Sequence, residues 1–225
     1  MLKYLIWPIY SGKLYIITVS YYIIIRSYTM IELTKKEQEA LLFIYKDISN
    51  FYNANSLSKE LGITQVGTMK ILKRFEVSNI LASKKIGKSI VYRVNIEDEF
   101  VQKLIAFILI NEASKYLRWK DEFESLHKKG RIVLFYGSAS RNYSRAKDID
   151  VFLILDEKDI REVNKKIEKI QNILPKKLHV IKATKEDFVR NIKDNNKSMI
   201  EIIKTAVVLY GYDEYMEIIN GFTSF

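Results

Sequence analysis

Two aspartates stand two residues apart just ahead of a strongly apolar run. Asp148 and Asp150 lead into Val-Phe-Leu-Ile-Leu at 151–155, a composition typical of a buried strand. In a strand, residues i and i+2 point to the same side, so the two carboxylates project together. Carboxylates this close raise each other's pKa unless a cation lies between them. The pattern therefore predicts a divalent cation site, and Mg²⁺ held by two carboxylates and substrate phosphates fits it.

A turn of small residues precedes the aspartates. Gly137 and Ser138 follow the apolar run 132–135, which predicts a first strand that ends in a tight turn. Small side chains allow backbone amides to approach a phosphate, above all where a helix begins. Arg141 can add positive charge beside it. Together with the aspartates, this turn predicts a metal–nucleotide site.

The stretch Phe-Tyr-Gly-Ser, a nine-residue loop and Asp-Ile-Asp resembles the nucleotidyltransferases of the DNA polymerase β superfamily, especially their minimal branch. The resemblance runs from about 131 to 225 and includes an expected helix over 158–173 and a strand over 178–182. It implies that Gly137 and Ser138 hold the triphosphate of ATP and that Asp148 and Asp150 bind Mg²⁺. It also implies in-line attack of a nucleophile on the α-phosphate, with pyrophosphate leaving beside Arg141.

The sequence departs from that family at the third carboxylate, which many active members carry on the later strand. Here the strand offers His179, either as a catalytic base or as an ordinary strand histidine. Two further interpretations stay open: in one, the aspartates pair with Lys147 or Arg145, and in the other, the domain binds nucleotide as a sensor without turnover.

The region 30–97 contains signals for helices and a hairpin. A capping box at Thr34 and Glu37 predicts a helix start, and a short helix with a Gly turn follows over 56–64. The helix after the Gly turn is expected over 65–75, with Val66 facing the core. A basic hairpin is expected after it, over 80–94. Seven basic residues stand against one acid between 68 and 93. The order of these elements resembles the winged helix-turn-helix family.

In that family the second helix of the turn enters the major groove of DNA and the wing contacts phosphate. The resemblance therefore implies a double-stranded DNA partner, and the alternative is a winged helix used for protein contact. The residues expected to face DNA are Gln65, Thr68, Lys70, Lys73, Lys84, Lys85 and Lys88.

One long connecting helix is expected within 98–128, because 98–126 contains neither Gly nor Pro. Its apolar residues occupy more than one face, which is typical of a helix buried on several sides. It is expected to pack on both domains or to form the seam of a homodimer.

The composition bounds the rest. The chain has 225 residues, a net charge of +10 and no cysteine, which excludes disulfides and thiolate metal sites and fits a cytoplasmic protein. The apolar extension 1–29 has three interpretations: translation begins at Met30, the segment anchors at a membrane, or it packs on the domain. A membrane partner is not expected, because the uninterrupted apolar run is too short to span.

These features predict an α+β protein with a winged helix-turn-helix at 30–97, a connecting helix and a nucleotidyltransferase-like mixed β-sheet flanked by helices at 129–225. The function expected from them is a DNA-binding protein that transfers a nucleoside monophosphate to a protein or small molecule. One version is an antitoxin that modifies a partner toxin, and the alternative is a transcriptional regulator whose second domain only binds nucleotide.

Overall fold

The computed structural model describes residues 32–223 and residue 225, so the extension expected over 1–29 lies outside the described residues. Residues 34–225 form one compact unit. Among the described residues, no helix is both long enough and apolar enough to cross a membrane.

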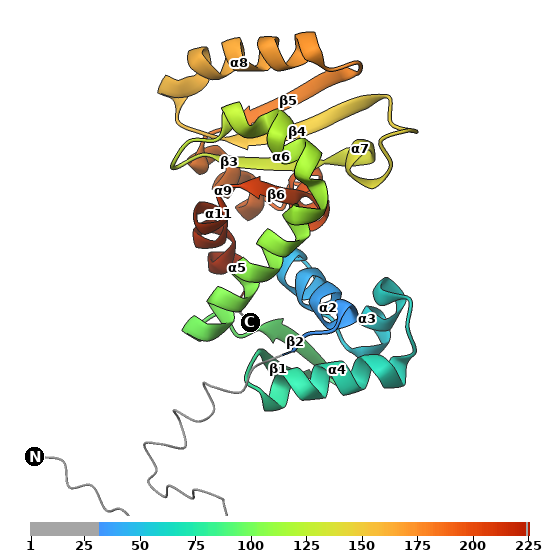
Figure 1. The fold of residues 1–225 in the computed structure, drawn as a ribbon. Helices are drawn as coiled ribbons and strands as arrows, with labels where there is room; N and C mark the ends of the chain where they lie inside the picture. Colours follow the sequence, from blue (N-terminus) through green and yellow to red (C-terminus); the bar gives the residue numbers. More distant parts are fainter. Residues whose placement is uncertain (1–31, 224) are drawn as a thin grey trace, which may run out of the picture. The chain divides into compact units, whose positions relative to one another are not determined.

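The unit begins with three helices and a two-stranded hairpin (Figure 1). They are α2 (Lys35–Lys46), α3 (Ala54–Leu61), α4 (Gln65–Val77), β1 (Leu81–Ile86) and β2 (Ser89–Val94). Thr34 and Glu37 form both hydrogen bonds of the expected capping box. Gly62, with φ of +63°, ends α3, and the Thr64 side chain caps α4, so a short turn separates the two helices. This order of elements is that of a winged helix-turn-helix.

The hairpin is antiparallel and has its tip in solvent. Leu81 lies opposite Val94, and Ile86 lies opposite Ser89. Gly87 at the tip has φ of +58°, a conformation that favours glycine. The base of the hairpin is buried against the helices, and the core of this part comprises Ala40, Leu41, Ile44, Tyr45, Leu57, Leu61, Leu72, Phe75, Ile80, Tyr92 and Val94.

The connecting segment is helical but is not the single helix that the sequence predicts. It consists of α5 (Glu99–Ala113), a 3₁₀ turn, α6 (Leu117–Phe123) and a second 3₁₀ turn that ends at Leu126. Tyr116 leaves the helical conformation, with φ of −117° and ψ of 36°. The break lets the rings of Tyr116 and Trp119 pack against Phe135 of the sheet, at centroid distances of 6.0 and 4.8 Å. Tertiary packing thus overrides a sequence that contains no helix breaker.

The C-terminal part is a four-stranded mixed sheet flanked by helices (Figure 1). The strands are β3 (Ile132–Tyr136), β4 (Asp148–Ile154), β5 (Lys177–Ala183) and β6 (Val207–Tyr210). Their order across the sheet is β5-β4-β3-β6. β4 and β5 are parallel, whereas β3 is antiparallel to both of its neighbours. The helices are α7 (Gly137–Arg141), α8 (Ile160–Ile173), α9 (Lys185–Lys193), α10 (Lys197–Thr205) and α11 (Tyr212–Ile219).

Alternate residues of the strands bury opposite faces of the sheet. One face packs against α6 and α8 in a single apolar cluster, which includes Trp119, Phe123, Phe135, Ile149, Val151, Leu153, Val163 and Ile170. On the other face, Phe152 contacts Phe188 of α9, with ring centroids 5.8 Å apart. Because Asp148 and Asp150 share the side of Phe152, the two carboxylates stand at one end of this second face.

Candidate metal centre

Strand pairing brings three ligand-type side chains together. Asp148 is the first residue of β4, and Asp150 follows on the same face. The parallel register sets Lys177 beside Asp148 and His179 beside Asp150. Register partners in a sheet point to the same side, so β5 adds an imidazole to the carboxylate pair.

Asp148, Asp150 and His179 converge closely enough to share one ion. Each offers a ligand atom, and the three atoms lie within 4.8 Å of one another. The Nδ1 atom of His179 lies 3.2 Å from Oδ2 of Asp148 and 3.7 Å from Oδ1 of Asp150. The side chains are 33%, 20% and 43% exposed, in that order, so a ligand from solution can reach all three.

The electrostatics of this corner favour a cation. Burial raises the pKa of Asp150 above its ordinary value, and the charge of Asp148 raises it further, whereas His179 acts in the opposite direction. Burial and the same two carboxylates also raise the pKa of Tyr136. A divalent ion would relieve this repulsion, and two carboxylates with one imidazole are a donor set that divalent ions accept.

Pairing of the aspartates with basic neighbours, the plain alternative, finds no support. Within 32–223, the ion pairs that Asp148 and Asp150 form are both with His179. Lys147 and Arg145 are exposed beside them in the loop that precedes β4. The loop is held instead by Lys176, whose Nζ donates to the carbonyl oxygens of Tyr143 and Ala146.

Gly137 is required by its backbone conformation and by its neighbour. Its φ is +77°, and a Cβ added there would lie 2.2 Å from Oδ2 of Asp150. The residue begins α7, directly after Tyr136, which lies opposite Asp150 in the sheet. The sequence pointed to Gly137 because phosphate could approach it, and the structure adds that the aspartate side chain occupies the space of its missing Cβ.

The other residues expected at the nucleotide lie in the same short segment. Ser138 is exposed in the first turn of α7, and Arg141 is exposed at its end. Glu186 and Asp187 stand in the first turn of α9 and not on the sheet face. His127 is exposed and stacks on Tyr210, with ring centroids 4.7 Å apart, so the second histidine of the chain lies outside the site.

Sequence reasoning missed three neighbours of the centre: Tyr136, Lys176 and Lys177. Tyr136 and Lys177 reach it only through strand register, which the sequence does not display. Lys176 acts through hydrogen bonds to a loop about 30 residues away in the chain. The one signal in the sequence is the pair Lys176 and Lys177 at the start of an apolar strand, and such a pair does not by itself indicate a functional site.

Six of the seven residues expected to face DNA are exposed. Gln65, Lys70 and Lys73 of α4 are exposed, and so are Lys84, Lys85 and Lys88 of the hairpin. Thr68 is instead fully buried, and its hydroxyl donates to the carbonyl oxygen of Thr64.

Leu72 and Phe75 are buried, but Val66, which the sequence predicts to face the core, lies outside the buried stripe of α4. Thr68, Leu72 and Phe75 form its buried stripe, spaced four and three residues apart, whereas Val66 and Met69 are 67% and 41% exposed. The outward face of α4 therefore combines Gln65, Val66, Met69, Lys70 and Lys73.

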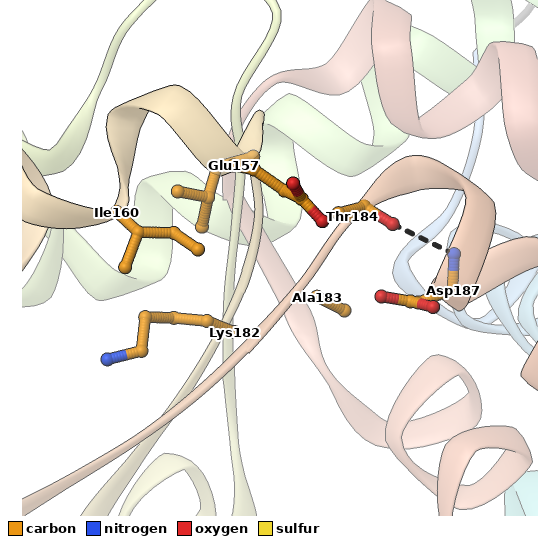
Figure 2. A pocket seen from close by; sticks show the side chains of 7 residues that line it. Glu157, Ile160, Lys182, Ala183, Thr184 and Asp187 are labelled. Carbon is orange, nitrogen blue, oxygen red and sulfur yellow. Dashed lines mark hydrogen bonds between the residues drawn. The ribbon is translucent and has the colours of Figure 1, made fainter.

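A separate small pocket lies at the far end of β4 and β5 (Figure 2). It is lined by Leu155, Glu157, Ile160, Lys182, Ala183, Thr184 and Asp187. Thr184 Oγ1 accepts a hydrogen bond from the backbone amide of Asp187 at 3.0 Å and so caps α9. The seven residues of β4 span about 20 Å, so this pocket does not belong to the metal centre.

Comparison with known families agrees with this geometry. The family described as "Nucleotidyltransferase domain" matches residues 118–209, a range that contains all four strands of the mixed sheet up to Leu209. It includes Gly137, Asp148, Asp150 and His179. A search of curated proteins found no match.

Among solved structures, the homodimeric winged helix-turn-helix DNA-binding domain of Mb0332 from Mycobacterium bovis is 13% identical, with 34% of this chain and 67% of that chain covered and a TM-score of 0.29. The adhesin competence repressor of Streptococcus pyogenes is 14% identical over 69% and 91%, with a TM-score of 0.30. A mutant of ZitR from Lactococcus lactis is 9% identical over 64% and 77%, with a TM-score of 0.31.

TM-scores this low establish no shared fold, so the winged-helix assignment rests on the order of α2 to β2 described above. The assignment of the mixed sheet to a nucleotidyltransferase domain is supported both by its strand order and by the family match. The chain thus joins a winged helix-turn-helix to a nucleotidyltransferase domain.

Proposed function

We propose that the corner formed by the end of β3, α7 and the start of β4 binds a nucleoside triphosphate with a divalent cation. We further propose that the domain transfers the nucleoside monophosphate to an acceptor. One observation carries this proposal: Asp148, Asp150 and His179 converge within 4.8 Å inside a nucleotidyltransferase domain. ATP and Mg²⁺ are the pair that the resemblance of the sequence favours.

Each residue has a distinct part in the proposed reaction. Asp148 and Asp150 hold the cation, which when bound supplies positive charge to the phosphates. The backbone at Gly137 and Ser138 lies beside the carboxylates and faces the triphosphate. Arg141 balances the charge that develops on the leaving group.

The reaction itself is a phosphoryl-type displacement at the α-phosphorus. An acceptor hydroxyl forms a new P–O bond while the bond to the bridging oxygen of the β-phosphate breaks, and pyrophosphate leaves in line. The hydroxyl proton passes to a base, and His179 is one candidate for it. The proposed acceptor is a protein or a small molecule, and a partner toxin is one concrete version.

A nucleotide-sensing regulator without turnover is the second candidate. The observation that favours it is the imidazole of His179 at the strand position where the resemblance leads one to expect a third carboxylate. Both candidates require nucleotide binding at this corner. Calorimetric titration of the protein with ATP and a divalent cation tests that shared requirement, and pyrophosphate release separates the two.

We also propose that the exposed faces of α4 and the hairpin bind double-stranded DNA. Six exposed polar and basic residues gather there, and within 32–223 the one of them that forms an ion pair is Lys73, with Glu76 at 2.7 Å. Replacing Lys70, Lys84 and Lys85 with glutamine removes three such charges. It is expected to weaken duplex binding and to reduce the slope of log K against log salt by up to about 3 units.

Fluorescence anisotropy with a labelled duplex across a salt series measures both effects. The matched control replaces Lys165 and Lys169, which are exposed on α8, together with exposed Lys158. An equal loss of affinity in the control would show that only net charge matters. An unchanged slope in the first variant would contradict DNA contact by these residues.

A homodimer formed through α5 is the third element of the proposal. Phe100, Phe107 and Ile110 of this helix are 45%, 58% and 45% exposed, an apolar stripe with spacings of seven and three residues. Phe107→Glu is expected to convert a dimer into a monomer, because a carboxylate at a buried seam is left without a partner. Sedimentation velocity measures the change, and a wild-type protein that is monomeric at all concentrations would contradict it.

A further inference from the structure

We propose that Nδ1 of His179 is a direct third ligand of the metal ion, so that the centre prefers a transition ion such as Mn²⁺ to Mg²⁺. This inference rests on the proposed metal–nucleotide site and concerns which ion occupies it. The site would then contain two carboxylate oxygens and one imidazole nitrogen in place of oxygen ligands alone.

The spacing of the three donors agrees with coordination of one ion. Two ligand atoms about 2.1 Å from a six-coordinate ion, at right angles to each other, lie about 3 Å apart. Nδ1 of His179 lies 3.2 Å from one carboxylate oxygen and 3.7 Å from the other. The nitrogen is therefore placed near both carboxylates at ligand spacing, where a simple hydrogen-bonded pair needs only one of them.

The burial of Leu178 and hydrogen bonds near the start of β5 fix the position of His179. Leu178 is buried on the opposite face, which turns His179 toward the aspartates. The backbone amide of Leu178 donates to Oε1 of Gln171 at 2.7 Å, and Lys176, just before β5, binds the loop that precedes β4. A ligand held by packing and by its own strand loses little freedom when an ion binds.

The nitrogen donor changes which ion is preferred. Mg²⁺ selects oxygen ligands, whereas imidazole suits transition ions, whose affinities exceed those of Mg²⁺ at mixed nitrogen and oxygen sites. Three ligands leave about half of an octahedral shell for phosphate oxygens and water. The centre is thus both complete enough to hold an ion and open enough to present it to a triphosphate.

A different role for His179 gives a different experimental result. If Asp148 only orients the imidazole, Nε2 acts as a base and no nitrogen contacts the ion. Pulsed electron paramagnetic resonance of bound Mn²⁺ separates the two roles, because a directly bound imidazole nitrogen gives a ¹⁴N modulation. Full-length protein without a histidine tag is required, since the chain itself contains only two histidines.

The experiment compares wild type, His179→Asp and the control His127→Gln. Wild type and His127→Gln should show the ¹⁴N modulation, and His179→Asp should lose it while still binding Mn²⁺ through oxygen. The ratio of Mn²⁺ to Mg²⁺ affinity, measured by competition against the free Mn²⁺ signal, should fall at least about tenfold in His179→Asp. Circular dichroism checks that each variant is folded.

Two results would overturn the inference. One is a wild-type protein that binds Mn²⁺ without ¹⁴N modulation, and the other is a modulation that survives in His179→Asp. ATP binding measured in the same samples with Mg²⁺ keeps this failure separate from that of the proposed function. Wild type that binds Mg²⁺–ATP but shows no ¹⁴N modulation would remove His179 from the metal and leave the nucleotide site standing.

Discussion

Gly137→Ala is expected to lose at least about tenfold in divalent-cation affinity while the protein remains folded. The added Cβ would lie 2.2 Å from Oδ2 of Asp150 and 3.0 Å from its Cγ, so the carboxylate must rotate away. The atom in the way is the end of a side chain and not backbone, which is why the site should fail before the fold. The left-handed backbone adds a strain of about 1 kcal/mol.

Gly130→Ala is the matched control for this substitution. Gly130 has φ of +84°, but no atom of the described residues lies within 4 Å of an added Cβ. It therefore carries the backbone strain without the collision. Titration with Mn²⁺ and thermal unfolding of both variants measure the two effects separately, and equal loss of metal affinity in Gly130→Ala would contradict the role assigned to Gly137.

Asp47→Ala is expected to lower the free energy of unfolding by about 3 kcal/mol, because it leaves the partly exposed Lys204 and the buried hydroxyl of Tyr52 without their partner. Asp47 is fully buried just after α2. Its carboxylate accepts hydrogen bonds from Tyr52 at 2.7 Å and Ser49 at 2.8 Å, and it pairs with Lys204 of α10 at 2.9 Å. The carboxylate thus links the first helix of the chain's winged part to a helix beside the mixed sheet.

The pKa of Asp47 predicts how this stability depends on pH. Burial alone would raise the pKa, but the hydrogen bonds from Tyr52, Lys204 and Ser49 lower it from 3.8 to about 2. A lowered folded-state pKa means that the stabilisation is complete above about pH 4 and is lost as the pH falls toward 2. The shift corresponds to about 2 kcal/mol.

Chemical denaturation of wild type and Asp47→Ala at pH 7 and pH 3 measures both statements. The difference between the two proteins should shrink at the lower pH. Asp156→Ala serves as the control, because Asp156 forms an exposed pair with Lys158 and should leave stability unchanged. A difference between wild type and Asp47→Ala that does not vary with pH would contradict the account of this carboxylate.

Several elements of the fold could be predicted from patterns of neighbouring residues in the sequence. The capping box at Thr34, the apolar run before Gly137 and the alternation around Asp148 each depend on neighbours in the chain, and each element formed where expected. The break at Tyr116 depends on its contact with Phe135 of the sheet, which no local pattern encodes. Periodicity alone did not determine which stripe of α4 the rest of the winged helix would cover.

Some residues of the candidate site could likewise be predicted from local spacing, whereas others depend on strand pairing. The two carboxylates were predictable as a pair because their spacing of two residues places them on one face of any strand. The place of His179 beside them required the parallel register of β4 and β5, which no local pattern encodes. The closeness of Gly137 to Asp150 likewise follows from the pairing of β3 with β4.

The most direct test of the central claim is calorimetric titration with ATP in the presence of Mg²⁺ or Mn²⁺. It compares wild type with the double variant Asp148→Ala Asp150→Ala, and a control that removes two exposed acids, Glu168→Ala Glu201→Ala. The account predicts metal-dependent ATP binding in wild type and in the control, and none in the aspartate variant although it is folded. Failure of folded wild-type protein to bind ATP with either ion, or equal binding by the aspartate variant, would contradict it.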